Sequence, residues 1–96
     1  MSSGSFVERH FESGDEIVVV RWHQPTAEPT GEYKCRWSIS WPDKERNSHS
    51  CGLDSVQALL LAMRTAHVEL VESDLYKAGN LTYTELRDLG LPSVWG

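Results

Sequence analysis

The sequence is short of basic residues, and none of those present form a run. It has 9 Lys and Arg against 14 Asp and Glu in 96 residues, which gives a formal net charge of −5. Nonspecific binding to nucleic acid needs clustered Lys and Arg to neutralise phosphates. We therefore expect no nucleic-acid partner, although exposed Trp side chains and Arg36 would be the residues to carry one.

Long hydrophobic runs are also missing. The longest, at residues 58–63, is far shorter than the roughly 20 apolar residues of a membrane-spanning helix. The first ten residues, MSSGSFVERH, have neither the basic segment nor the apolar segment of a signal peptide. These absences predict a cytoplasmic protein that does not associate with membranes.

Cysteine is scarce, and its spacing fits no metal motif. Cys35 and Cys51 could be combined with His23 and His49 into a zinc site, but there is no C-x-x-C and no His pair at i, i+3 or i, i+4. We predict no metal and no cofactor, and reduced thiols in a cytoplasmic protein. Cys35 lies mid-strand on a face expected to be buried, so a packed thiol is favoured over a nucleophile.

What the chain does contain is alternation of apolar and polar residues over its first half. In YKCRWSISW, at residues 33–41, every second side chain is apolar or aromatic, which is the period of a half-buried strand. Loop 24–31, QPTAEPTG, is expected to be irregular because proline cannot donate to a ladder. Strands are predicted at residues 5–12, 16–24, 32–41 and 48–51.

The period then changes to that of a helix. Apolar residues at Val56, Leu60, Met63 and Leu70 form one stripe. The helix is predicted over residues 55–78, with an end near residue 73 as the alternative. Asp54 is the expected N-cap with Gln57 as its capping-box partner, and Gly79 suits the position after the C-cap.

These elements predict one α+β domain spanning residues 1–96. An antiparallel sheet of about four strands, in meander order, carries one long helix on one face, and a short strand or turn follows at the C-terminus. The helix stripe is expected to pack on Cys35, Trp37 and Ile39. Trp41, at the strand end, is the aromatic side chain most open to a binding role.

Residues 16–24 are apolar on both faces, which indicates cover on both sides of the sheet. Val18, Val20 and Trp22 form one face and Ile17 and Val19 the other. Either a second subunit or the C-terminal tail, with Leu89, Leu91, Val94 and Trp95, would supply the second cover. We favour a homodimer.

The candidate binding residues are few and none carries a specific motif: Trp41, Arg36, His49, Glu69 and Glu72. Glu69 and Glu72 lie with Asp74 at the acidic end of the helix, which is either a solvated face or a contact surface for a basic partner. No catalytic residue is predicted. His67, on the apolar side of the helix, is interpreted as a neutral packed imidazole rather than as an acid/base group or metal ligand.

Three pieces of the sequence resemble a family of small uncharacterised bacterial proteins. They are Cys35-x-x-x-Ile39, the run G-x-D-S-V-Q-A-L-x-L-A at residues 52–62, and Gly-Leu-Pro at residues 90–92. The resemblance covers residues 17–92. It implies a cytoplasmic bacterial protein of unknown function and brings no activity, cofactor or catalytic residue.

The sequence thus favours a non-enzymatic protein-interaction module, in one version an immunity-type protein that blocks a toxin through its acidic surface. The partner would be another protein or a second copy of the chain. The alternative is a small-ligand-binding protein or an enzyme, with a pocket between helix and sheet that uses His67 or His49. The depth and polarity of any pocket distinguish the two.

Overall fold

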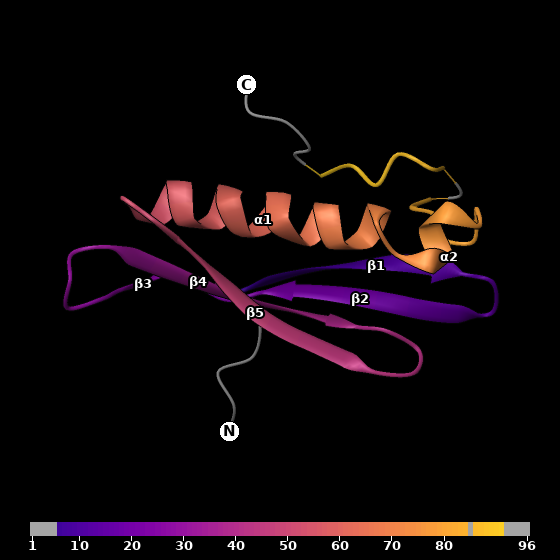
Figure 1. Cartoon of the computed structure of the whole chain (residues 1–96), viewed down its shortest axis with the longest axis horizontal. Helices are drawn as coiled ribbons and strands as arrows, with labels where there is room; N and C mark the ends of the chain where they lie inside the picture. Colours follow the sequence, from indigo (N-terminus) through magenta and orange to yellow (C-terminus); the bar gives the residue numbers. More distant parts are fainter. Residues whose placement is uncertain (1–5, 85, 92–96) are drawn as a thin grey trace.

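An antiparallel sheet carries one long helix across one of its faces (Figure 1). The computed structural model describes residues 6–84 and 86–91. Its elements are β1 (Val7–Ser13), β2 (Glu16–Trp22), β3 (Thr26–Ala27), β4 (Tyr33–Ser40), β5 (Glu45–Gly52), α1 (Ser55–Val71) and α2 (Asp74–Lys77). The α+β architecture predicted from the sequence is confirmed. None of the described helices is long and apolar enough to cross a membrane.

The sheet runs β1, β2, β4, with β5 on the far side of β4. The short strand β3 was not predicted. It pairs Thr26 with Lys34 and Ala27 with Tyr33, at the start of β4. Pro25 and Pro29 flank this segment without entering it, so its two residues keep the N–H groups that a ladder needs.

The face of the sheet beneath α1 forms the core. Cys35, Trp37 and Ile39 are at most 1% exposed, which confirms their predicted packing. Trp37 lies directly opposite Trp22 of β2. The indole N–H groups of these two rings have no hydrogen-bond acceptor among the described residues. Apolar packing of the rings, rather than polar pairing, therefore holds this layer together.

The helix presents a different stripe to this face from the one predicted. Its buried residues are Ala58, Ala62, Ala66 and Leu70, whereas Val56 is 64% and Leu60 43% exposed. The prediction was right for Leu70, partly right for the half-buried Met63, and wrong for Val56 and Leu60. Small alanines allow the helix backbone to approach a sheet that already carries two tryptophans, so the larger aliphatic side chains lie outside the contact.

The predicted helix start is confirmed, but the predicted end at residue 78 is wrong, because α1 ends at Val71, close to the alternative near residue 73. Asp54 caps α1 by accepting from the Gln57 N–H at 2.8 Å, and the Gln57 side chain accepts from the Leu53 N–H at 2.7 Å. The chain leaves the helix after Val71, and Ser73 caps the separate α2. Gly79 follows α2 with a φ of 80°, as expected for the residue after a helix C-cap.

The C-terminal segment packs on the same side of the sheet as α1, beside β1. Leu81 and Leu89 are buried, and Thr82 exchanges backbone hydrogen bonds with Glu12 at 2.8 and 3.0 Å. The Arg9 guanidinium donates to the Leu89 carbonyl at 3.1 Å. As far as Leu91, the last described residue, the segment therefore completes the core on the α1 side of the sheet and does not cover the opposite face. Val94 and Trp95, which were expected to contribute cover, lie outside the described residues.

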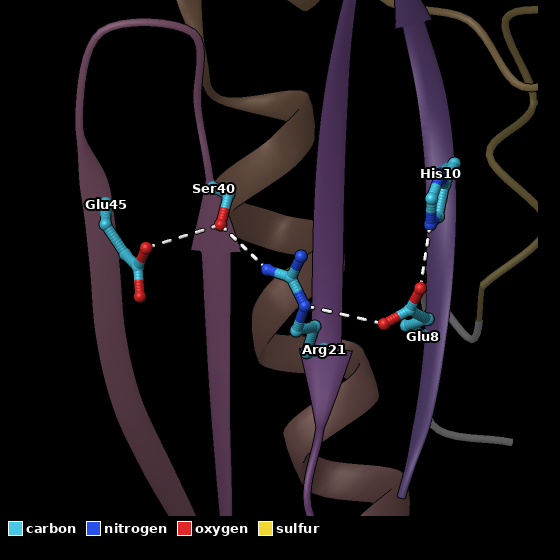
Figure 2. A network of polar contacts seen from close by, with 5 residues as sticks. All are labelled: Glu8, His10, Arg21, Ser40 and Glu45. Carbon is cyan, nitrogen blue, oxygen red and sulfur yellow. Dashed lines mark hydrogen bonds and ion pairs between the residues drawn. The ribbon is translucent and has the colours of Figure 1, made fainter. Parts of the chain in front are cut away.

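The opposite face of the sheet is largely polar. Figure 2 shows a chain of contacts across four strands, from His10 and Glu8 through Arg21 to Ser40 and Glu45. The Glu8 carboxylate accepts from His10 at 2.8 Å and lies 3.4 Å from the Arg21 Nε. Among the apolar residues of β2, Ile17 is exposed and Val19 partly so. Within β2, Ile17 and Val19 are therefore the residues that form the predicted second apolar face in need of cover.

Ile39→Ala and Leu60→Ala test which apolar residues form the core. Ile39 is fully buried, so its truncation should lower the free energy of unfolding by about 2–5 kcal/mol. Leu60 is 43% exposed, so its loss should be below about 1 kcal/mol. Urea denaturation followed by circular dichroism measures both. Equal losses for the two variants would contradict the helix orientation.

Gly52→Ala should destabilise the fold although glycine here has an ordinary backbone conformation. A Cβ at this position would lie 2.5 Å from the Ala58 backbone N and 2.9 Å from the Gln57 carbonyl carbon. Backbone atoms cannot move aside as a side chain can, so we expect a loss of about 1–3 kcal/mol. Ser50→Ala, two residues earlier on the same face of β5, is the control and should be near neutral. A Gly52→Ala protein as stable as the control would refute the close approach.

Candidate functional site

A groove lies where the β4–β5 turn faces the end of α1. It has a volume of about 760 Å³ and is open to solvent. Three connections meet at this end of the molecule, namely the β1–β2 turn, the β4–β5 turn and the α1–α2 junction (Figure 1). The lining residues are Glu16, Trp41, Pro42, Asp43, Lys44, Glu45, Arg46, Glu69, Glu72, Ser73, Asp74 and Leu75.

Local chain geometry positions both walls. The Trp41 N–H donates to the Lys44 carbonyl at 2.8 Å and closes the turn between β4 and β5, with Pro42 at a turn position that suits its fixed φ. On the other wall, α1 ends at Val71 and Ser73 begins α2 by accepting from the Tyr76 N–H. This break directs the chain away from the helix axis and leaves the groove beside it.

One charge-paired contact spans the groove. The Arg46 guanidinium donates to both oxygens of Glu69, at 3.2 and 3.1 Å. The hydrogen bond to Glu69 and its negative charge raise the pKa of Arg46. The guanidinium also lies 5.9 Å from the centre of the Trp37 ring. Arg46 is thus neutralised by a partner inside the protein and adds no free positive charge to the groove.

Negative charge dominates the lining as a whole. Six carboxylates stand against two basic side chains. Glu72 pairs with Lys77 at 3.3 Å. Glu16, Asp43 and Asp74 have no hydrogen-bond or ion-pair partner for their side chains among residues 6–84 and 86–91. Unpaired carboxylates beside one another raise the local affinity for cations.

Trp41 adds an aromatic surface to this acidic groove. Its ring is half-buried, packed against the edge of the core while part of it remains open. Among aromatic side chains, the indole ring of Trp attracts a cation held over its face most strongly. Of the five candidate residues, the structure brings together Trp41, Glu69 and Glu72 along one groove.

The other two candidates lie elsewhere. Arg36 and His49 are direct cross-strand partners on β4 and β5. Both are exposed, on the sheet face opposite α1. They form no part of the groove, and their side chains have no hydrogen-bond partner among residues 6–84 and 86–91.

His67 does not line the groove, and the buried rings of Trp22 and Trp37 lie in the layer between helix and sheet. His67 is partly buried, and burial lowers its pKa while the charge of Asp88 acts in the opposite direction. The folded state therefore favours the neutral imidazole, in line with the packed interpretation. Among the described residues, no three His, Cys, Asp or Glu side chains are arranged to hold a metal ion.

Three of the groove carboxylates, Glu16, Asp43 and Glu45, were missed in the sequence, whereas Asp74 belongs to the acidic helix end together with Glu69 and Glu72. Glu16 follows the β1–β2 turn, and Asp43 and Glu45 lie in or beside the β4–β5 turn, where an acidic residue is ordinary. No local pattern marks them as related. Only the fold, which collects these connections at one end, makes them neighbours.

Residues 7–93 match DUF6968, described as a domain of unknown function. The chain belongs to the DUF6968 family. No curated protein and no solved structure matches it. The predicted resemblance to a family of unknown function is thereby confirmed, and the match also takes in β1.

The motif that carried the resemblance has a structural explanation in this DUF6968 chain. Gly52 permits the close contact with α1, Asp54 and Gln57 cap the helix, and Ala58 and Ala62 pack on the sheet. None of these residues lines the groove. The run at residues 52–62 is therefore explained by the capping and docking of α1, and not by a role in the groove.

The two thiols should differ sharply in reactivity. Cys35 is fully buried, its Sγ donates to the His23 carbonyl at 3.2 Å, and burial raises its pKa to about 11. Cys51 is exposed. Because the thiolate is the reactive form, we expect one thiol to react rapidly with Ellman's reagent in native protein and the second only on unfolding. A Cys51→Ser protein should show no rapid reaction. Fast labelling of Cys35 in that variant would contradict its packed environment.

Proposed function

We propose that this DUF6968 protein is a small, non-enzymatic interaction module of the bacterial cytoplasm that binds a basic segment of another protein in the acidic groove. The observation that carries the proposal is the combination of three unpaired carboxylates with the partly exposed ring of Trp41 in one groove. A Lys or Arg side chain satisfies both features, since it can lie over the indole and approach the carboxylates.

The electrostatics of the groove favour a protein segment over other partners. The formal charge of −5 attracts cationic partners and repels phosphate, so neither nucleic acid nor an anionic membrane surface belongs to this function. The groove is open rather than enclosed, which suits a peptide or a loop better than a small molecule that needs burial. An immunity-type role, in which the groove blocks a basic surface of a toxin, is one form of this function.

Charge complementarity of this kind acts mainly on the rate and specificity of association. Exposed ion pairs each contribute about 0.2–1 kcal/mol and are screened by salt. A cation over an exposed ring adds about 0.5–1 kcal/mol. Binding through the groove alone is therefore expected to be modest and strongly dependent on ionic strength.

Titration with a short Lys/Arg-rich peptide, followed by calorimetry, tests the proposal. At low salt, Asp43→Asn with Asp74→Asn should weaken binding about fivefold per charge removed, corresponding to ~1 kcal/mol each. Trp41→Leu, which keeps an apolar side chain but removes the ring, should weaken it about threefold, the effect of the exposed cation–ring contact. Raising the salt concentration should weaken binding of the unmodified protein.

Glu32→Gln is the matched control, because Glu32 is an exposed carboxylate outside the groove. It removes one negative charge and so reproduces the change in net charge of either single variant, Asp43→Asn or Asp74→Asn, with which it is compared. An equal loss of affinity in Glu32→Gln and in the groove variants would show that only net charge matters. Absence of binding at low salt would reject the groove as a site for basic segments.

A further inference from the structure

One edge of the sheet is open along a whole strand. β5 pairs with β4 over all eight of its residues, and no other described strand pairs with it. Figure 1 is viewed onto this edge, where β5 crosses in front of the other strands. The outward N–H and C=O groups of such a strand form a template for another strand.

The composition of β5 does nothing to protect this edge. After Glu45 and Arg46, residues 47–52 are uncharged and contain neither lysine nor proline, which are the residues that usually block edge pairing. The opposite edge is different. β1 carries charged side chains at Glu8, Arg9 and Glu12, and its end is already paired through backbone hydrogen bonds with Thr82.

We propose that β5 pairs with β5 of a second copy of this chain, antiparallel about a two-fold axis at His49, to give one continuous sheet. Pairs in this register have residue numbers that add to 98. Ser48 then lies opposite Ser50 of the second copy and Asn47 opposite Cys51, so small uncharged side chains meet. Arg46 lies opposite Gly52, which leaves no like charges opposed along the strand.

Features beside the edge favour a second copy over an unrelated strand. Leu53, which directly follows β5, is 78% exposed, a high value for a leucine. In the proposed register Leu53 lies opposite Glu45 of the second copy, next to that copy's β4–β5 turn. The same arrangement brings the start of α1, which carries partial positive charge, towards the acidic end of the second copy. Both copies gain the same contacts, as a two-fold interface requires.

The flank of α1 next to β5 adds apolar surface on the helix side. The Ser50 hydroxyl donates to Thr65 at 3.5 Å, which places this side of the helix over the edge strand. Val68, one turn further on, is 51% exposed. A strand added outside β5 would lie against this flank.

The assembly state of the full chain tests the proposal. Sedimentation equilibrium at micromolar concentration should give about twice the 10.9 kDa of one chain. His49→Lys places two lysines opposite each other at the axis, and should raise the dimer dissociation constant at least tenfold. His10→Lys, the same change at an exposed histidine on the β1 edge, should leave the mass unchanged. This measurement does not depend on binding in the groove.

Disulfide trapping tests the register. In a Cys51→Ser background, His49→Cys should form a crosslinked dimer under mild oxidation, because directly opposed Cβ atoms lie about 4.5–5.5 Å apart. Glu45→Cys should not crosslink, since its counterpart would be about 26 Å away at 3.3 Å per residue.

Three results would overturn the proposal. The first is a mass of one chain at all concentrations tested, a result that rejects the dimer even if an extended peptide is found to bind the edge. The second is a dimer that His49→Lys leaves intact. The third is a dimer that is dissociated by Leu60→Glu and not by His49→Lys, which would locate the contact on the outer face of α1.

Discussion

The close approach of α1 to the sheet is the contact on which the remaining structure depends. The sheet contributes the bulk of this layer through Trp22 and Trp37, and the helix contributes small side chains at Ala58, Ala62 and Ala66. Large residues on one surface and small ones on the other fill the space at the density that protein interiors require. Gly52 extends the same principle to the end of β5, where even one methyl group would meet the helix backbone.

This packing is tight at one end of the molecule and open at the other. The end of β5 lies against the start of α1, while the β4–β5 turn lies apart from the end of the helix (Figure 1). Arg46 reaches across that gap to Glu69 with two hydrogen bonds. The groove is thus a consequence of how helix and sheet diverge, and its acidic lining comes from connections that converge where the layers separate.

The two sheet faces have different physical roles. The face under α1 is apolar and is completed by the C-terminal segment, whereas the other is crossed by polar contacts from β1 to β5 (Figure 2). Antiparallel sheets commonly have one buried and one solvated face. The β-branched run of β2 also places residues on the solvated face, since Ile17 remains exposed. The high β-propensity of such residues accounts for their presence there without burial.

Much of the fold was determined locally and could be predicted from the sequence. Strict alternation around Trp37 marked β4 and its buried face, Asp54 and Gln57 marked the start of α1, and Gly79 marked where helical structure ends, although not the break between α1 and α2. Each of these signals depends on neighbours a few residues away. Helix docking also constrains residues 52–62 together.

Only the tertiary structure decided which side of α1 is buried and which residues form the groove. The helix is apolar on nearly all sides, so its periodicity left several stripes possible, and the volume of Trp22 and Trp37 selected the alanines. Pro25 and Pro29 suggested a loop, yet the free side of β4 was available to pair with Thr26 and Ala27. Glu16, Asp43 and Asp74 line one groove because segments far apart in sequence meet at this end of the fold. Proximity of that kind leaves no local pattern in the sequence.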